Sequence, residues 1–146
     1  MNMEILFRRE FGNLISKYNM KYLLISDNEF ALVGRKFALV FLIHLGDIFI
    51  RYINANDHGE LDVYNFDSFL FSKFNDVDRE NIKKSNTVEE KISNELQIIA
   101  RGLLNHWHNL LEGDKNWLGE YLKYPLAGKP KKANPQIIDI FGDLKN

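Results

Sequence analysis

FALVGRKFALVFLIHLGDIFIRYI, residues 30–53, is the most apolar stretch of this 146-residue chain and decides its fold. Short runs rich in Val, Ile and Phe, bounded by turn residues, indicate β-strands. Two breaks interrupt the stretch, at residues 34–36 and 45–47, and each contains a glycine that can supply the positive φ of a tight hairpin. The stretch therefore predicts three antiparallel strands.

Side chains of these strands divide between two faces of the predicted sheet. If both hairpin loops have an even number of residues, directly paired residues share a side. The heavier side, called the aromatic face, holds Phe30, Leu32, Phe37, Leu39, Phe41, Ile43, Ile48, Ile50 and Tyr52. The light face holds Ala31, Val33, Ala38, Val40, Leu42, His44, Phe49, Arg51 and Ile53. Because the light face is also mostly apolar, we expect both faces to be covered, the second by this chain or by another.

The flanking segments extend this sheet and pack on it. Apolar residues at steps of three and four predict an amphipathic helix over about residues 3–18. Residues 20–26 and 61–66 have the composition of a first and a last strand. Residues 67–74 fit either a short helix, capped by Asp67 or Ser68, or an extension of the last strand.

The C-terminal part of the domain is predicted to be helical. Thr87 and Glu90 form a capping-box pattern, and an apolar stripe beyond them predicts a long helix that ends at Gly113. Asp114 can cap a shorter helix that runs through Lys123. We therefore expect an α+β fold: an antiparallel meander of about five strands, packed by an N-terminal helix and a long C-terminal helix.

A change of composition separates residues 1–124, the expected single α+β domain, from residues 125–146. Prolines and lysines at the start of the second segment indicate an extended arm. Asn134 and Pro135 then form a helix entry, a cap followed by a first-turn proline. The residues that follow are too apolar for a free tail: Ile137, Ile138, Ile140, Phe141 and Leu144. We expect this arm to dock on the light face or on a neighbouring chain.

Composition excludes several classes of function. The chain has no cysteine, so disulfides and thiolate metal sites are excluded. A net charge of −1 gives no general attraction to nucleic acid or anionic lipid. The longest apolar run, residues 37–43, is too short to span a membrane, and the charged N-terminal residues do not fit a secretory signal. We expect a cytoplasmic protein with no membrane or nucleic-acid partner.

Histidines are the first candidates for chemistry. His106 and His108 lie two residues apart, so on a helix their rings diverge, whereas zinc-binding pairs on a helix are four residues apart. His106 lies at the edge of the apolar stripe of the predicted helix and is predicted to be a hydrogen-bonded structural residue. His108 lies on the solvent-exposed face of that helix. His44 with Asp47 beside a hairpin is also predicted to be structural.

The polar loop at residues 54–60 offers Asp57, His58 and Glu60 together, a possible acid–base or cation site. Its spacing does not match a calcium loop, and turns recruit Asn, Asp and Gly for backbone reasons alone. The chain has no serine nucleophile elbow and no phosphate-binding glycine loop, and its cluster of lysines near residue 130 fits a solvated linker. We therefore expect no catalytic residue, no metal and no cofactor.

Acidic residues gather in two predicted irregular segments. The candidate partner-binding residues are Asp57, His58, Glu60 and Asp62 in one segment and Asp76, Asp78 and Glu80 in the other. Such patches can attract a basic protein partner and speed its association. Acidic loops also keep proteins soluble without binding anything. The pattern alone leaves both readings open.

An amphipathic helix, a hydrophobic meander and a C-terminal helix pair follow one another in this chain. They are carried by FGNLISKYN (residues 11–19), FALVGRKFALVFLIHLGDIFIRYIN (30–54) and TVEEKISNELQIIARGLLNHW (87–107). This layout resembles the small α+β immunity proteins of bacterial toxin systems. The resemblance implies a non-catalytic protein that inhibits a toxin by binding it. Two alternatives stay open: a metal-assisted enzyme with a site near residues 54–60 or His106, and a structural homodimer.

Overall fold

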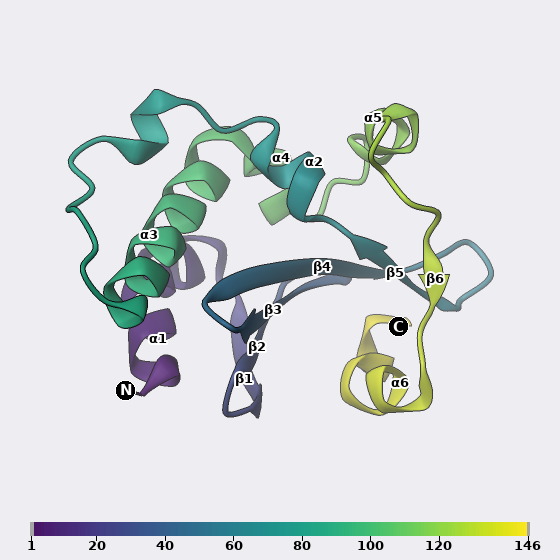
Figure 1. Cartoon of the computed structure of the whole chain (residues 1–146). Coiled ribbons are helices and arrows are strands. Elements are labelled where there is room, and N and C mark those ends of the chain that lie inside the picture. Colours follow the sequence, from purple (N-terminus) through teal and green to yellow (C-terminus); the bar gives the residue numbers. More distant parts are fainter. Residues whose placement is uncertain (1, 146) are drawn as a thin grey trace.

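A computed structural model of the chain describes residues 2–145 and has an α+β fold (Figure 1). Within these residues, six antiparallel strands form one sheet in chain order. The strands are Lys21–Ser26 (β1), Glu29–Val33 (β2), Phe37–His44 (β3), Asp47–Ala55 (β4), Leu61–Asn65 (β5) and Lys131–Lys132 (β6). The α-helices are Met3–Tyr18 (α1), Asp67–Phe71 (α2), Val88–His106 (α3), His108–Leu111 (α4), Leu118–Lys123 (α5) and Pro135–Phe141 (α6). Two 3-10 helices are Asp76–Arg79 (η1) and Gly142–Lys145 (η2).

The sixth strand corrects the expected count of about five. Lys131 and Lys132 of β6 pair with Val63 and Asp62 of β5, inside the segment expected to be an unpaired arm. A strand of two lysines has no apolar alternation, so hydrophobic patterning cannot detect it. Lysine is nevertheless a common residue at the edge of a sheet, where its charge discourages further strand pairing.

Both central hairpins have even loops, as the assignment of the two faces requires. Leu45 and Gly46 join β3 to β4 with φ values of 51° and 82°, the left-handed pair that matches the twist of a two-residue hairpin. Across the β2–β3 turn the Gly34 N–H donates to the Phe37 carbonyl at 3.0 Å, which leaves two residues in that loop. The predicted division into an aromatic face and a light face is confirmed.

The aromatic face is the main core, and α1 and α3 cover it (Figure 1). None of its predicted residues is more than 7% exposed. Phe7 and Phe11 of α1 stack with their ring centroids 4.5 Å apart, and both rings lie 5.1 Å from that of Phe41 in the sheet. Rings of this size dominate core energetics because each removes a large apolar area from water.

Only part of the light face is covered, and the cover is the C-terminal segment, which lies on the opposite side of the sheet from α1 and α3 (Figure 1). Asn134 caps α6 as predicted by accepting the Ile137 N–H at 2.9 Å, and Pro135 occupies the first turn. Phe141 and Leu144 are buried against the sheet. The half of the light face nearest the β3–β4 hairpin remains partly or fully exposed: Leu42, His44, Phe49 and Arg51.

The long C-terminal helix begins as predicted but is shorter than predicted. Thr87 caps α3 by accepting the Glu90 N–H at 3.1 Å. At Trp107 the backbone leaves helical geometry, with φ −124° and ψ 31°, and α4 follows as a separate piece. The Trp107 indole is buried and donates to the Leu70 carbonyl at 3.4 Å, so tertiary packing overrides the helical pattern at this residue.

Two other predicted caps have different roles. Residues 67–71 are helical, which settles one open choice, but Asp67 does not cap α2. Its carboxylate instead accepts the Ile50 N–H of β4 at 2.8 Å. Asp114 accepts the Asn116 N–H at 2.8 Å in a turn, and α5 starts later, at Leu118.

Replacing Gly12 by alanine is expected to stabilise the protein by about 0.5–1 kcal/mol. Gly12 lies inside α1, and a Cβ added there meets no atom within 4 Å. Urea unfolding of the two proteins measures the change. Gly34→Ala is the matched control, because its new Cβ would collide with the buried ring of Phe37, and it should destabilise. A Gly12 variant less stable than the parent would show a constraint on α1 that packing does not reveal.

Candidate functional site

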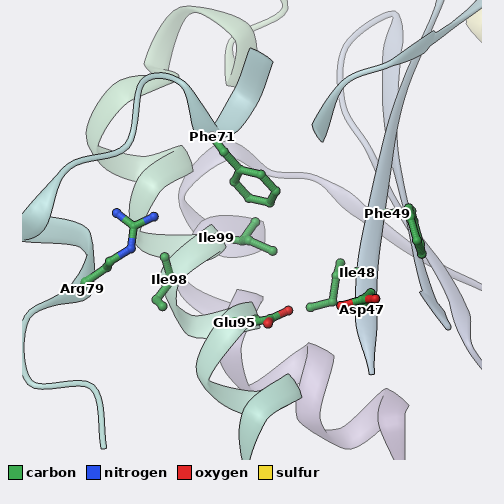
Figure 2. Close-up of a pocket in the computed structure, with 8 residues that line it drawn as sticks. All are labelled: Asp47, Ile48, Phe49, Phe71, Arg79, Glu95, Ile98 and Ile99. Carbon is green, nitrogen blue, oxygen red and sulfur yellow. The ribbon is translucent and has the colours of Figure 1, made fainter. Parts of the chain in front are cut away.

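A groove of about 570 Å³ lies between the start of β4, α2 and α3 (Figure 2). Its walls consist of Asp47, Ile48, Phe49, Phe71, Arg79, Glu95, Ile98 and Ile99. Figure 2 shows Ile48 pointing from β4 toward α3, Phe71 pointing from α2 toward Ile99, and Phe49 on the other side of β4. The volume falls in the range of roughly 300–1,000 Å³ typical of ligand sites.

The groove exists because β5 pairs with only the second half of β4. Pairing starts at Arg51, opposite Asn65, and continues to Ala55. At Phe66 the chain turns away from the sheet into α2, with a last hydrogen bond of 3.0 Å from the Phe66 N–H to the Ile50 carbonyl. Within residues 2–145, no strand pairs with the first part of β4 on the β5 side.

This arrangement leaves a short open strand edge at Ile48. Backbone N–H and C=O groups alternate in direction along a strand, so those of Ile48 point the same way as those of Ile50. At Ile50 both groups are satisfied, the N–H by Asp67 and the C=O by Phe66. At Ile48, no residue of the described chain takes the corresponding place.

Large apolar side chains are exposed around this edge. Phe49 is 43% exposed and Phe71 is 36% exposed, and both belong to the groove walls. At the rim, Leu45 is 88% exposed at the hairpin tip and Val88 is 61% exposed. Gly46 lies against Val88, which places the hairpin tip beside the start of α3. Contiguous exposed apolar residues are a common feature of interaction surfaces.

Charges at the two sides of the groove have opposite signs. The Lys91 ammonium lies 3.4 Å from an Asp47 carboxylate oxygen and 3.8 Å from one of Glu95, so two carboxylates share one cation. Burial raises the pKa of Glu95; Lys91 lowers it and Asp47 raises it again, and the net shift is upward. Arg79 lies on the opposite side, where its guanidinium donates to the Asn75 carbonyl at 3.4 Å. The groove wall is therefore net negative at the hairpin end, and at the other end its one charged residue is the cation Arg79.

One of the three carboxylates in the predicted acidic segment, residues 54–62, is paired with a lysine. Glu60 lies 2.7 Å from the Lys132 ammonium of β6, and this hydrogen bond and charge lower the pKa of Glu60. Asp62 accepts from the Asn56 amide at 3.3 Å. Asp57 and His58 are exposed. The structure thus brings lysines to this loop and does not gather its carboxylates on one open surface.

Asp78 differs from the other candidate partner-binding residues because it is fully buried. Its carboxylate accepts from the Asn105 amide and His106 Nε2 at 2.8 Å each, and from the Asn75 N–H at 2.9 Å. Burial acts to raise the pKa of Asp78, but these hydrogen bonds outweigh it and the pKa is lowered. Asp78 is closed to any partner and ties η1 to α3. The structural role predicted for His106 is confirmed.

The remaining candidates, Asp76 and Glu80, are exposed next to the groove residue Arg79. Both lie in or directly after η1, on either side of Arg79 in the chain. The Glu80 carbonyl accepts from Arg101 of α3 at 2.5 Å, which holds this connection against the helix. These two carboxylates therefore belong to the surroundings of the groove, whereas Asp57 and His58 lie on a different loop.

The sequence pattern did not predict one row of interacting polar side chains, Tyr18, His108 and Glu112. The Tyr18 hydroxyl lies 2.7 Å from His108 Nδ1, and His108 Nε2 lies 3.2 Å from a Glu112 carboxylate oxygen. Burial, together with Glu112, raises the pKa of Tyr18, so the hydroxyl is not activated. His108 and Glu112 are more than half exposed, and the contact links the end of α1 to α4. Across residues 2–145, no cluster of three or more His, Asp or Glu side chains could hold a metal ion.

Comparisons with known protein families, with curated proteins and with solved structures found no match to this chain. From residue 2 to residue 145, no helix combines the length and apolarity needed to cross a membrane. The geometry of the groove and of its surroundings is therefore the basis for a functional conclusion.

Proposed function

We propose that this protein acts by binding another protein, without catalysis, and that the partner docks over the groove between β4 and α3. The observation that carries the proposal is the exposure of Phe49 and Phe71 at an unpaired strand edge. Aromatic residues are enriched in the centres of protein interfaces, and charged residues belong to their rims. Asp47, Glu95 and Arg79 supply such a rim.

Within this class, we propose an immunity protein that binds and inhibits a bacterial toxin. The sequence of helix, meander and helix supports this role, since the immunity proteins that the chain resembles share that layout. Asp76 and Glu80 beside the groove add negative charge, which speeds the approach of a basic partner. Inhibition would follow from occlusion of the toxin surface.

Serine substitution of both Phe49 and Phe71 is expected to reduce capture of the partner from host cells at least about tenfold, the effect of losing an aromatic interface anchor. The matched control replaces Leu122 and Leu126, which are 62% and 72% exposed and lie outside the groove walls. Quantitative mass spectrometry of proteins recovered with each tagged variant measures the difference.

Equal recovery by both double variants would refute docking at the groove. Growth of cells that express a toxin encoded beside this gene tests the finer role. The parent protein and the Leu122/Leu126 control should protect these cells, and the Phe49/Phe71 variant should not. Cells that die in spite of the parent protein would remove the immunity role. Recovery of this same chain as the main partner, with a dimer in light scattering, would instead establish a homodimer.

A further inference from the structure

We propose that the part of the partner that enters the groove is an extended strand, which pairs with the backbone of Ile48 and inserts an apolar side chain between β4 and α3. The inference rests on the proposed function and names the conformation and chemistry of the bound segment. Addition of a strand to an open sheet edge is a recurring mode of peptide recognition.

Backbone geometry selects an extended segment over a helix. The N–H and C=O of Ile48 face the open side of β4. The backbone groups of Ile50 face the same side, and Phe66 and Asp67 satisfy them. Within the described chain the place beside Ile48 is unfilled, so an incoming strand continues the line along which β5 pairs with β4. A helix has no free backbone groups along its side to match these two.

Register then fixes where the side chains of the bound segment point. Directly paired residues of neighbouring strands share a side, so the residue opposite Ile48 points toward α3. There it meets Ile99 and Phe71, and Ile98 continues the apolar wall on the side of Arg79. The residues before and after it point to the other side, beside Phe49. The bound segment therefore needs an apolar residue at its centre.

The charged residues at the two ends of the groove favour one orientation of the bound segment. Asp47 and Glu95 share the single ammonium of Lys91 at the hairpin end, and this end favours a basic side chain. Arg79 at the other end favours an acidic one. An extended segment with a basic residue, an apolar centre and an acidic residue complements the groove along its whole length.

The test uses random peptides displayed on phage and selected on the full chain. Selected peptides are expected to show the basic–apolar–acidic pattern. A synthetic copy should slow hydrogen exchange of the Ile48 amide at least about tenfold, and methylation of the backbone nitrogen of its central residue should weaken binding about tenfold. Ile98→Ser should weaken binding similarly, and Leu122→Ser should leave it unchanged.

Two results would overturn the inference. Peptides that bind in the groove without protecting the Ile48 amide, and that tolerate backbone methylation, would show apolar docking without strand pairing. A selection that yields no peptide sensitive to Ile98→Ser would show that no extended segment is recognised. Neither result would refute the proposed function, which has its own test. Capture of a folded partner by the parent protein, and not by the Phe49/Phe71 variant, would still support it.

Discussion

Removal of residues 125–146 is expected to lower the free energy of unfolding by about 5 kcal/mol. The main reason is that two buried apolar side chains, Phe141 and Leu144, are lost together, and each contributes as much as a large core residue. Both side chains are buried against the light face, at 3% and 6% exposure. For a chain of this length the melting temperature should fall by roughly 10–20 °C, at about 2–4 °C per kcal/mol. Differential scanning calorimetry measures both quantities.

Loss of the arm also uncovers apolar surface on the light face. Ala31, Val40 and Ile53 are buried in the cluster that the C-terminal segment completes. Self-association of the shortened protein, detected by light scattering, is therefore expected. Ile138→Ser is the control, since Ile138 is 40% exposed on α6 and its change should cost about 0.5 kcal/mol or less. A shortened protein that is monodisperse and melts at the parent temperature would show that the arm contributes no stability.

Patterns that act over a few residues predicted most of the fold. Period-two alternation with even hairpin loops assigned every residue of the aromatic face correctly. The pattern is informative because a shift of the strand register by one residue would move these side chains to the other face of the sheet. Asn134 and Thr87 were found as caps because a cap is a contact between residues three apart in sequence. These features are local and leave a direct mark on the sequence.

Features that depend on distant contacts were not predictable. The helix break at Trp107 follows from packing its indole beneath the Leu70 carbonyl, and β6 follows from pairing with β5. Asp78 looked like one of several surface acids, yet its partners Asn105 and His106 lie far along the chain. No periodicity in residues 75–86 distinguishes the buried carboxylate from its exposed neighbours.

The groove is another consequence of distant contacts. It arises where β5 leaves β4, and Asp67 ends the pairing by taking the Ile50 N–H. Phe49 belongs to the mostly apolar light face, but nothing in the sequence pattern joins it to Phe71 or to α3. The charge pattern therefore predicts partner binding on the acidic loops, and the structure adds a second candidate surface, the exposed apolar residues at a strand edge.

Substitution of Asp78 by asparagine is expected to lower the free energy of unfolding by about 3 kcal/mol at neutral pH. The substitution replaces an acceptor-only carboxylate by an amide, whose NH₂ group faces donors from Asn105, His106 and Asn75. At least one of those donors then loses its partner in a site that water does not reach. Urea unfolding of the parent and the variant measures the difference.

The difference should also depend on pH in a defined direction. Because folding lowers the pKa of Asp78 below its unfolded value of about 3.9, the carboxylate stabilises the fold fully above that value. The contribution is lost as the pH falls through the lower, folded pKa. The gap between parent and variant should therefore be present above about pH 5 and narrow below about pH 4. Asp76→Asn, the same charge change at an exposed neighbour, should shift stability by about 0.5 kcal/mol or less. A gap that is absent at neutral pH, or that does not narrow below about pH 4, would mean that these hydrogen bonds do not hold Asp78 in its ionised form.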